Sequence, residues 1–182
     1  TSDKRETVAF VEALSGLIDN KTFPLLAEAL IDESPRSVAA VAWALSTSRA
    51  YSPSLLLELL SKPGISRPAV LDVIAAHKSR FQLRDLLNAA YLQDPNEKAA
   101  LFRIAGTMVD ETSVDELVAR VEGKDPIARV HIIALLARFN TPKVRAALMT
   151  TLKDPNKQLR SAALQSIAAM EGPVDPAQVA PL

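Results

Sequence analysis

Apolar residues recur along the chain with the three- and four-residue spacing of amphipathic helices, in blocks separated by short polar stretches. The blocks come in pairs. The first block of a pair carries Leu or Val on one side, as at Leu56 and Leu60, whereas the second is apolar on most sides, as in "VHIIALLA" (130–137). A helix that is apolar on most sides is covered on most sides. The pattern therefore predicts repeated helix pairs with a deeply packed second helix.

Proline marks the start of the second blocks. It occurs at positions 35, 63, 95, 126 and 155, at intervals of 28, 32, 31 and 29 residues. In the second unit Pro68 follows closely, and the helix is expected to start at Ser66. An Asp or Ser before proline favours a helix start, because its side chain can accept from free N–H groups while proline is tolerated at the first helical position. A period near 30 residues is typical of stacked supersecondary units.

A second set of helix-capping residues lies between these prolines, at Thr22, Ser52, Ser79, Ser113 and Thr141. Three helix starts also fit the capping-box pattern, at Ser79–Gln82, Asp94–Glu97 and Ser113–Glu116. Two interleaved sets of starts predict two helices per unit. The five units are expected at residues 22–50, 51–78, 79–109, 110–139 and 140–170.

The two ends of the chain differ from these units. Residues 5–18 predict one further helix, which could cap the first unit, and residues 172–182 carry three prolines and one glycine, as in an extended tail or linker. A length of 182 residues suits one domain or a short repeat array. We therefore expect a single domain over residues 1–171 followed by the tail 172–182. Because the chain starts with Thr1 rather than Met, we also expect it to be part of a larger protein.

The fifth unit, "DPNKQLRSAALQSIA" (154–168), resembles the HEAT-repeat family, in particular the short bacterial HEAT-like repeats of phycobilisome lyases. In the second helix of that pattern, an acidic residue and often proline precede Val-Arg and later Ala. The matching positions here are Asp154, Pro155, Leu159, Arg160, Ala163 and Ile167. The fourth unit fits from Asp125, with His131 at the Arg position. The family commonly forms an Asp–Arg ladder between repeats, and only the fifth unit keeps this Arg, so a continuous ladder is not expected.

The resemblance, which covers roughly residues 22–170, implies an all-α fold. This fold would be a right-handed α-solenoid of about five stacked HEAT-like helical hairpins plus an N-terminal helix, with the second helices lining the concave side. Solenoids of this kind serve many roles, so the resemblance indicates architecture more strongly than function.

Composition narrows the functional classes. The chain has no Cys, which excludes disulfides, thiolate metal sites and Cys nucleophiles. Lys plus Arg and Asp plus Glu both number 21, and a zero net charge argues against nucleic-acid or membrane binding by the whole surface. No apolar run is long enough for a membrane span, and Glu12 interrupts the only apolar stretch near the start, so no signal peptide is predicted. We expect a cytoplasmic location.

Charge is nevertheless uneven along the chain. Residues 1–60 hold 5 basic and 8 acidic side chains, whereas residues 125–182 hold 7 and 4. The basic residues of the second segment are Arg129, Arg138, Lys143, Arg145, Lys153, Lys157 and Arg160. Ordinary solvated helix surface explains such a distribution, and a site for an acidic segment or a phosphate backbone is the functional alternative.

Few residues are candidates for catalysis or metal binding. The two histidines, His77 and His131, are 54 residues apart and lack a second ligand at helical spacing, so neither a metal nor another cofactor is expected. We expect His77 at a helix end and His131 on a repeat face. No phosphate-binding loop or nucleophile motif occurs. Trp43, the only Trp, is expected in the core, but if it faces the groove it would be a good anchor for a partner.

The hypothesis that follows is a non-enzymatic scaffold or regulatory domain that binds a segment of another protein, or a neighbouring domain of the same chain, on its concave surface. The residues expected to contact the partner are Trp43, Arg103, Arg129, His131, Lys157 and Arg160. Two alternatives stay open. One is nucleic-acid binding through the basic C-terminal half, and the other is an enzyme related to bilin lyases.

Overall fold

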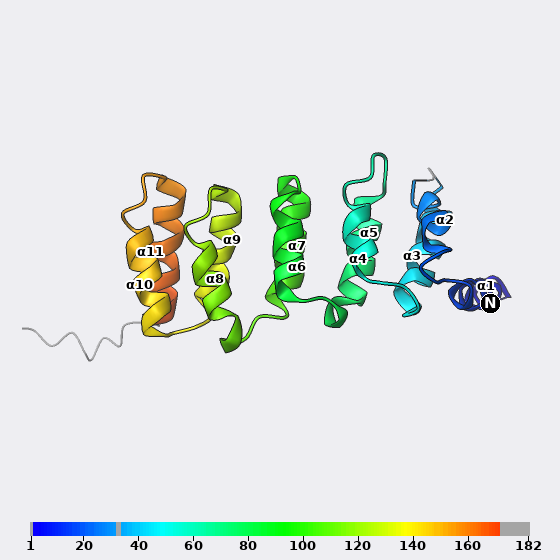
Figure 1. The fold of residues 1–182 in the computed structure, drawn as a ribbon, viewed down its shortest axis with the longest axis horizontal. Coiled ribbons are helices and arrows are strands. Elements are labelled where there is room, and N and C mark those ends of the chain that lie inside the picture. The colour runs from blue at the N-terminus through cyan, green and yellow to red at the C-terminus, as the bar shows by residue number, and fades with distance from the viewer. Residues whose placement is uncertain (1, 32–33, 172–182) are drawn as a thin grey trace, which may run out of the picture. The chain divides into compact units, whose positions relative to one another are not determined.

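The computed structural model describes residues 2–31 and 34–171, and these residues contain helices and no strand (Figure 1). The chain divides into two compact units, Thr1–Met108 and Val109–Leu182, which are called unit 1 and unit 2 here and described separately. The predicted all-α repeat fold is confirmed. The tail expected at 172–182 lies outside the described residues, and a single domain over 1–171 stays a prediction.

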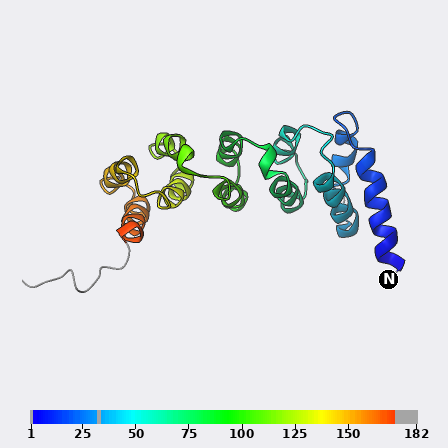
Figure 2. The ribbon, with the colours of Figure 1, turned by 90° about the horizontal axis from the view of Figure 1, so that it is seen from below.

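Unit 1 contains one single helix and three helix pairs. The helices are α1 (Ser2–Gly16), α2 (Phe23–Glu28), α3 (Pro35–Thr47), α4 (Ser54–Leu59), α5 (Arg67–Ala76), α6 (Leu83–Tyr91) and α7 (Pro95–Gly106). A 3₁₀ turn, Lys78–Arg80, precedes α6. Within this unit the second helices α3, α5 and α7 pack side by side in one layer, and α1 lies against α3 (Figure 2).

Unit 2 contains two helix pairs. A 3₁₀ turn, Glu111–Ser113, leads into α8 (Val114–Arg120), which is followed by α9 (Pro126–Leu136), α10 (Pro142–Thr151) and α11 (Lys157–Glu171). The first helices α8 and α10 contact each other, and the second helices α9 and α11 do the same. In the part of the chain that is described, no helix is long and apolar enough to cross a membrane.

The predicted start of the second helix is confirmed in four of the five helix-pair repeats and is displaced in the fifth repeat. Helices α3, α7 and α9 begin at the proline, and α5 begins directly after Ser66. In the fifth repeat α11 begins at Lys157, two residues after Pro155. The Asp154 carboxylate accepts from the Asn156 N–H (2.8 Å), and the Asn156 side chain accepts from the Gln158 N–H (2.8 Å). Asn156 therefore takes the capping role and Asp154 closes a turn.

The capping boxes expected from the sequence are not formed as predicted. Residues Lys78–Arg80 form a 3₁₀ turn, so α6 starts at Leu83, after the whole Ser79–Gln82 pattern. Asp94 makes no side-chain bond to the start of α7. At α8 the box forms one turn earlier, where Asp110 accepts from the Thr112 N–H and Ser113 accepts from the Asp110 N–H. A better acceptor three residues upstream thus displaces the box that Ser113 and Glu116 were expected to form.

Each unit has its own core on the shared side of its helices. In unit 1 the fully buried side chains include Leu45, Leu56, Ile74, Leu86 and Leu101. In unit 2 they include Leu117, Ile132, Leu136, Leu148 and Leu159. Both helices of every pair from α4 to α11 contribute to this core, so the polar face of each helix is left to form the surface.

Candidate partner-binding surface

Trp43 projects from the second helix α3, away from the core. The buried residues of α3 are Val41, Ala44 and Leu45, and Trp43 is 48% exposed. At about 100° per residue, Trp43 lies on a different side of the helix from this buried stripe. The prediction of a core Trp43 is therefore wrong, because the neighbouring residues on its own side are alanines and leave it uncovered. Its role as an anchor for a partner stays a prediction.

A groove of about 600 Å³ runs between α1 and α3 on one side of Trp43. Its α1 wall includes Asp3, Glu6 and Phe10, and its α3 wall includes Arg36 and Trp43. Phe10 is 58% exposed, although it is a large aromatic residue. Large aromatic side chains in a hollowed surface are typical of protein interfaces.

A second groove, of about 580 Å³, lies on the other side of Trp43, between α3 and α5. Small residues of α3 line it, including Ala39 and Ala42, and Asp72 of α5 stands at its edge. Trp43 thus forms a ridge between two grooves of the same unit. We name this region the Trp43 surface and define it by six residues: Asp3, Glu6, Phe10, Arg36, Trp43 and Asp72.

The Trp43 surface has an acidic rim. Asp3 and Arg36 form an ion pair of 3.1 Å in which both side chains are 81% exposed, so solvent screens it strongly. The Asp72 carboxylate is exposed and has no ion pair or hydrogen bond among the described residues. With Glu6, the surface carries three carboxylates and one guanidinium. The six residues that define this surface therefore have a negative formal charge.

The other predicted contact residues lie elsewhere, and two of them stabilise a turn. In unit 2, Arg129 donates to the Asp154 carboxylate at 2.6 Å and also to the Val121 carbonyl. Arg160 donates to the carbonyls of Asp154 and Pro155, both at 2.8 Å. The bonds of Arg129 join the turn before α11 to the previous helix pair. The pKa of Asp154 is lowered chiefly by the bond from the Asn156 N–H and then by the bond from Arg129.

The Arg129–Asp154 pair forms one rung of a repeat ladder, and a continuous ladder was not expected. In the fourth repeat, the sequence pattern has His131 at the position of the ladder Arg, and His131 is half-buried on α9. The structure instead uses Arg129, two residues earlier, to reach the Asp of the next repeat. The long side chain of Arg129 spans the difference in register, so one rung forms between the fourth and fifth repeats.

Arg103 and Lys157 are the remaining predicted contact residues. Both are exposed, Arg103 on α7 in unit 1 and Lys157 at the start of α11 in unit 2. No ion pair engages either residue within the described ranges. The lining of the two grooves beside Trp43 includes neither of them. Their roles as contact residues stay predictions.

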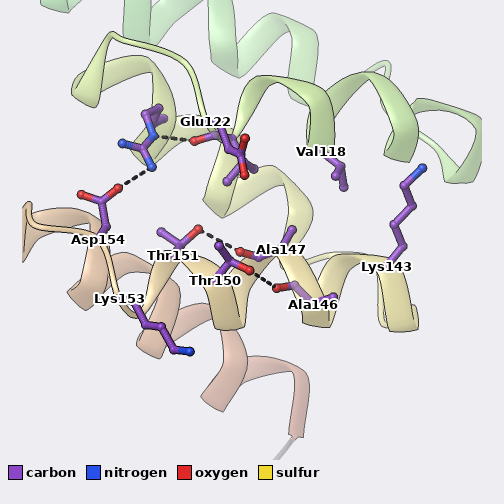
Figure 3. Close-up of a pocket in the computed structure, with 11 residues that line it drawn as sticks. Val118, Glu122, Lys143, Ala146, Ala147, Thr150, Thr151, Lys153 and Asp154 are labelled. Carbon is purple, nitrogen blue, oxygen red and sulfur yellow. Dashed lines mark hydrogen bonds and ion pairs between the residues drawn. The ribbon is translucent and has the colours of Figure 1, made fainter.

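A further groove, of about 650 Å³, lies in unit 2 between the first helices α8 and α10 (Figure 3). We name it the α8–α10 groove; among the residues that line it are Val118, Glu122, Arg129, Lys143, Thr150 and Asp154. The residues predicted to contact a partner all lie on second helices, so the sequence did not predict this groove, although Lys143 and Lys153 belong to the basic segment noted in the sequence. The available signal was the run Ala146-Ala147, since small residues on α10 leave space next to α8.

Most polar groups of the α8–α10 groove already have partners within unit 2. Arg129 pairs with Asp154, and Lys143 pairs with Asp115. The hydroxyls of Thr150 and Thr151 donate to carbonyls one turn earlier in α10, at 3.0 and 2.9 Å (Figure 3). A ligand would have to compete with these bonds.

A buried polar cluster in unit 1 joins the ends of α3 and α5. The Tyr51 hydroxyl donates to the Leu45 carbonyl at 2.6 Å, and His77 Nε2 lies 2.7 Å from the same oxygen. A carbonyl only accepts, so Nε2 carries a proton. Arg80 donates to the Tyr51 carbonyl at 2.6 Å and its guanidinium lies over the Tyr51 ring. The interpretation of His77 as a helix-end residue is confirmed.

Burial determines the protonation of this cluster. It lowers the pKa of His77 and raises the pKa of Tyr51 well above its ordinary value. Nearby Arg80 adds to the lowering at His77. His77 is 2% exposed, so its ring cannot contact a dissolved substrate in this conformation. The cluster therefore has a structural role.

Comparison with known proteins gives one match. A family model of HEAT repeats matches residues 83–168 and 114–182, which together span 83–182, more than half of the chain. The comparisons with curated proteins and with solved structures return no match. The matched region begins at α6 and includes the two helix pairs of unit 2.

Proposed function

This chain belongs to the HEAT-repeat family, and from that premise we propose that it is a non-enzymatic scaffold that binds a segment of another protein, or a neighbouring domain of its own chain, on its second-helix side. HEAT repeats generally mediate protein–protein interaction and are typically not enzymes. The proposal assigns the contact to the Trp43 surface. The single observation that carries it is an exposed Trp on the second helix α3, between one groove beside α1 and another beside α5.

Three features of the Trp43 surface support this assignment. Trp is among the residues most enriched in binding hot spots, and Trp43 is half exposed beside both grooves. Phe10 adds a second exposed aromatic ring on the same surface. Helix α3 packs against both α1 and α5, and a preorganised surface lowers the entropic cost of binding.

The contacts of the basic residues favour a protein partner over nucleic acid. Arg129, Lys143 and Arg145 are each paired with a carboxylate of unit 2, the last of them with Glu171 at 3.7 Å. A phosphate backbone would have to displace these carboxylates. Nucleic-acid binding at the basic end is therefore not proposed.

Selection from a displayed library of random peptides of about 15 residues tests the proposal, with wild-type protein and a Trp43→Ala variant as parallel targets. We expect peptides that bind the wild type and lose at least about tenfold in affinity for Trp43→Ala. A Leu92→Ala variant is the matched control, because Leu92 is also a large exposed apolar residue of unit 1 and lies outside the Trp43 surface. Selected peptides that bind wild type and Trp43→Ala equally, or the absence of any selected peptide, would contradict the proposal.

A further inference from the structure

The groove between α1 and α3 is a channel with two matching walls. On α1 the lining residues are Asp3, Glu6, Thr7 and Phe10, and on α3 they include Arg36, Ala39, Ala40 and Trp43. The α1 set and these four α3 residues follow the i, i+3, i+4, i+7 spacing of a single helix face, and Ser37 and the N-cap Ser34 add polar groups at the start of α3. The groove therefore follows the helix axes over two turns, a distance of about 10 Å at 1.5 Å per residue.

The two walls run in the same direction. Asp3 pairs with Arg36 near the start of both helices, and the Ser15 hydroxyl lies 3.3 Å from the Ala44 carbonyl near their ends. Asp3, Glu6 and Arg36 consequently form a charged end of the groove. Phe10 and Trp43, each seven residues further along its helix, form an aromatic end. An occupant of the groove therefore meets charged side chains at one end and aromatic rings at the other.

The groove contains small side chains that leave space for another helix. Ala39 and Ala40 are the smallest side chains in the lining, and they leave the volume of about 600 Å³ between the larger walls. In unit 1, α1 is the one described helix that has no hairpin partner, and it exposes Val8 and Phe10. A helix laid into a groove contacts it through side chains at i, i+3, i+4 and i+7, which is the spacing of both walls.

The acidic residues of the Trp43 surface favour a positively charged partner. The Trp43 surface carries three carboxylates and one guanidinium, and residues 1–60 as a whole hold 8 acidic and 5 basic side chains. Asp72 has no partner among the described residues that would neutralise it. The faces of exposed Trp and Phe rings also attract cations. Acidic rim and aromatic faces therefore both favour Lys or Arg in the partner.

We propose that the partner segment is a cationic amphipathic helix, whose apolar stripe lies along the α1–α3 groove against Phe10 and Trp43 and whose Lys or Arg residues face Asp3, Glu6 and Asp72. This inference rests on the proposed function and defines the chemical class of its partner. The helix–helix contact supplies affinity, and the carboxylates supply selectivity for charge.

Two designed peptides of about 15 residues test this class of partner. Both carry Leu at i, i+3, i+4 and i+7, and they differ only in having Lys or Glu at all flanking positions. Binding is followed by the fluorescence of Trp43, the only Trp of the chain. We expect the Lys peptide to shift the emission to shorter wavelength and to bind at least about tenfold more tightly than the Glu peptide at low salt.

A charge-reversed protein provides the sharpest control. In the double variant Glu6→Lys/Asp72→Lys the rim becomes basic, so the preference is expected to change to the Glu peptide while the helix content by circular dichroism stays the same. A Leu92→Ala variant should bind both peptides as the wild type does. Equal binding of the two peptides, a preference for the Glu peptide by the wild type, or no change of preference on charge reversal would overturn the inference.

The outcomes separate this inference from the proposed function. If the random library yields Trp43-dependent peptides that are acidic or uncharged, the scaffold function stands and the cationic partner is overturned. If no peptide from any source depends on Trp43, both are overturned. A Trp43 emission that shifts with protein concentration alone would show a second copy of the chain in the groove, which also overturns the cationic helix.

Discussion

The Trp43 surface of unit 1 and the α8–α10 groove of unit 2 have similar volumes, about 600 Å³ beside α1 and about 650 Å³. They differ in what their side chains do. In the α8–α10 groove, Arg129, Lys143 and Thr150 each bond to a group of unit 2. On the Trp43 surface two aromatic rings are exposed, and Asp72 has no partner among the described residues.

This difference shows that volume alone does not identify a binding surface in a helical repeat. Grooves arise wherever neighbouring helices carry small side chains, as at Ala39 and Ala146. A groove becomes a candidate for recognition when its lining contains uncovered apolar area and polar groups that still have bonding capacity. The Trp43 surface satisfies both conditions, whereas most polar groups that line the α8–α10 groove already have partners within unit 2.

Arg129→Ala should give the largest effect. The Arg129 and Asp154 side chains are only 15% and 12% exposed, so the variant leaves a poorly solvated carboxylate and a carbonyl without their donor. We expect the Tm of thermal unfolding, followed by circular dichroism, to fall by about 5 °C or more. Lys143→Ala is the control, because its pair with Asp115 is largely exposed, and its Tm should change by at most about 2 °C. Equal losses in both variants would contradict the junction role of the Arg129–Asp154 pair.

Trp43→Ala should separate binding from stability. Because Trp43 is exposed and Ala is a good helix former, the free energy of unfolding should change by no more than about 1 kcal/mol. Affinity for selected peptides should fall at least about tenfold in the same variant. Urea titration and fluorescence anisotropy of labelled peptides measure the two quantities. A large loss of stability would show that Trp43 is a packing residue instead of a contact residue.

Acidification should weaken the two units in different pH ranges. Burial lowers the pKa of His77 below 6.5, so the folded state binds fewer protons than the unfolded state and unit 1 loses stability as the pH falls below about 6.5. Hydrogen bonds lower the pKa of Asp154 below 3.8, so its stabilisation is complete above that pH and is lost as the pH falls further. Unfolding at a series of pH values measures both ranges.

Two conservative variants assign these ranges to their residues. His77→Gln keeps an N–H donor for the Leu45 carbonyl and should flatten the loss of stability just below pH 6.5. Asp154→Asn keeps an acceptor in the turn and should leave that upper range unchanged. An unchanged pH profile in His77→Gln would exclude His77 as its cause.

Thr150→Val should have the smallest effect. Its hydroxyl donates only to the Ala146 carbonyl of its own helix, and Val keeps the branched shape. We expect the free energy of unfolding to stay within about 0.5 kcal/mol of wild type and peptide binding to be unchanged. A marked loss of peptide affinity would mean that the α8–α10 groove also contacts a partner.

The repeat and most helix starts could be predicted from the sequence because caps and prolines act locally. Ser34, Asp125 and Thr141 each accept from an N–H at the helix start that was expected. The local argument failed where two acceptors compete, as when Asn156 instead of Asp154 capped α11. Which acceptor wins depends on the turn geometry, and a residue pattern does not contain that geometry.

Predictions about the surface failed where they depended on tertiary packing. The exposure of Trp43 follows from the direction in which α3 faces, which the alanine-rich sequence around it leaves open. The pairing of Arg129 with Asp154 depends on the offset between consecutive repeats, so an alignment of positions pointed to His131 instead. Phe10 and Asp72 join Trp43 only after α1, α3 and α5 are packed together.

Site-specific photo-crosslinking in cells that produce the protein tests the central claim most directly. A benzophenone side chain is placed at position 43, and in separate variants at the exposed control positions Leu92 in unit 1 and Met149 in unit 2. If the Trp43 surface binds a protein partner, position 43 gives a discrete adduct of higher mass, identified by mass spectrometry, and the control positions do not. Adducts at Leu92 or Met149 without one at position 43 would contradict the assignment of the partner to the Trp43 surface.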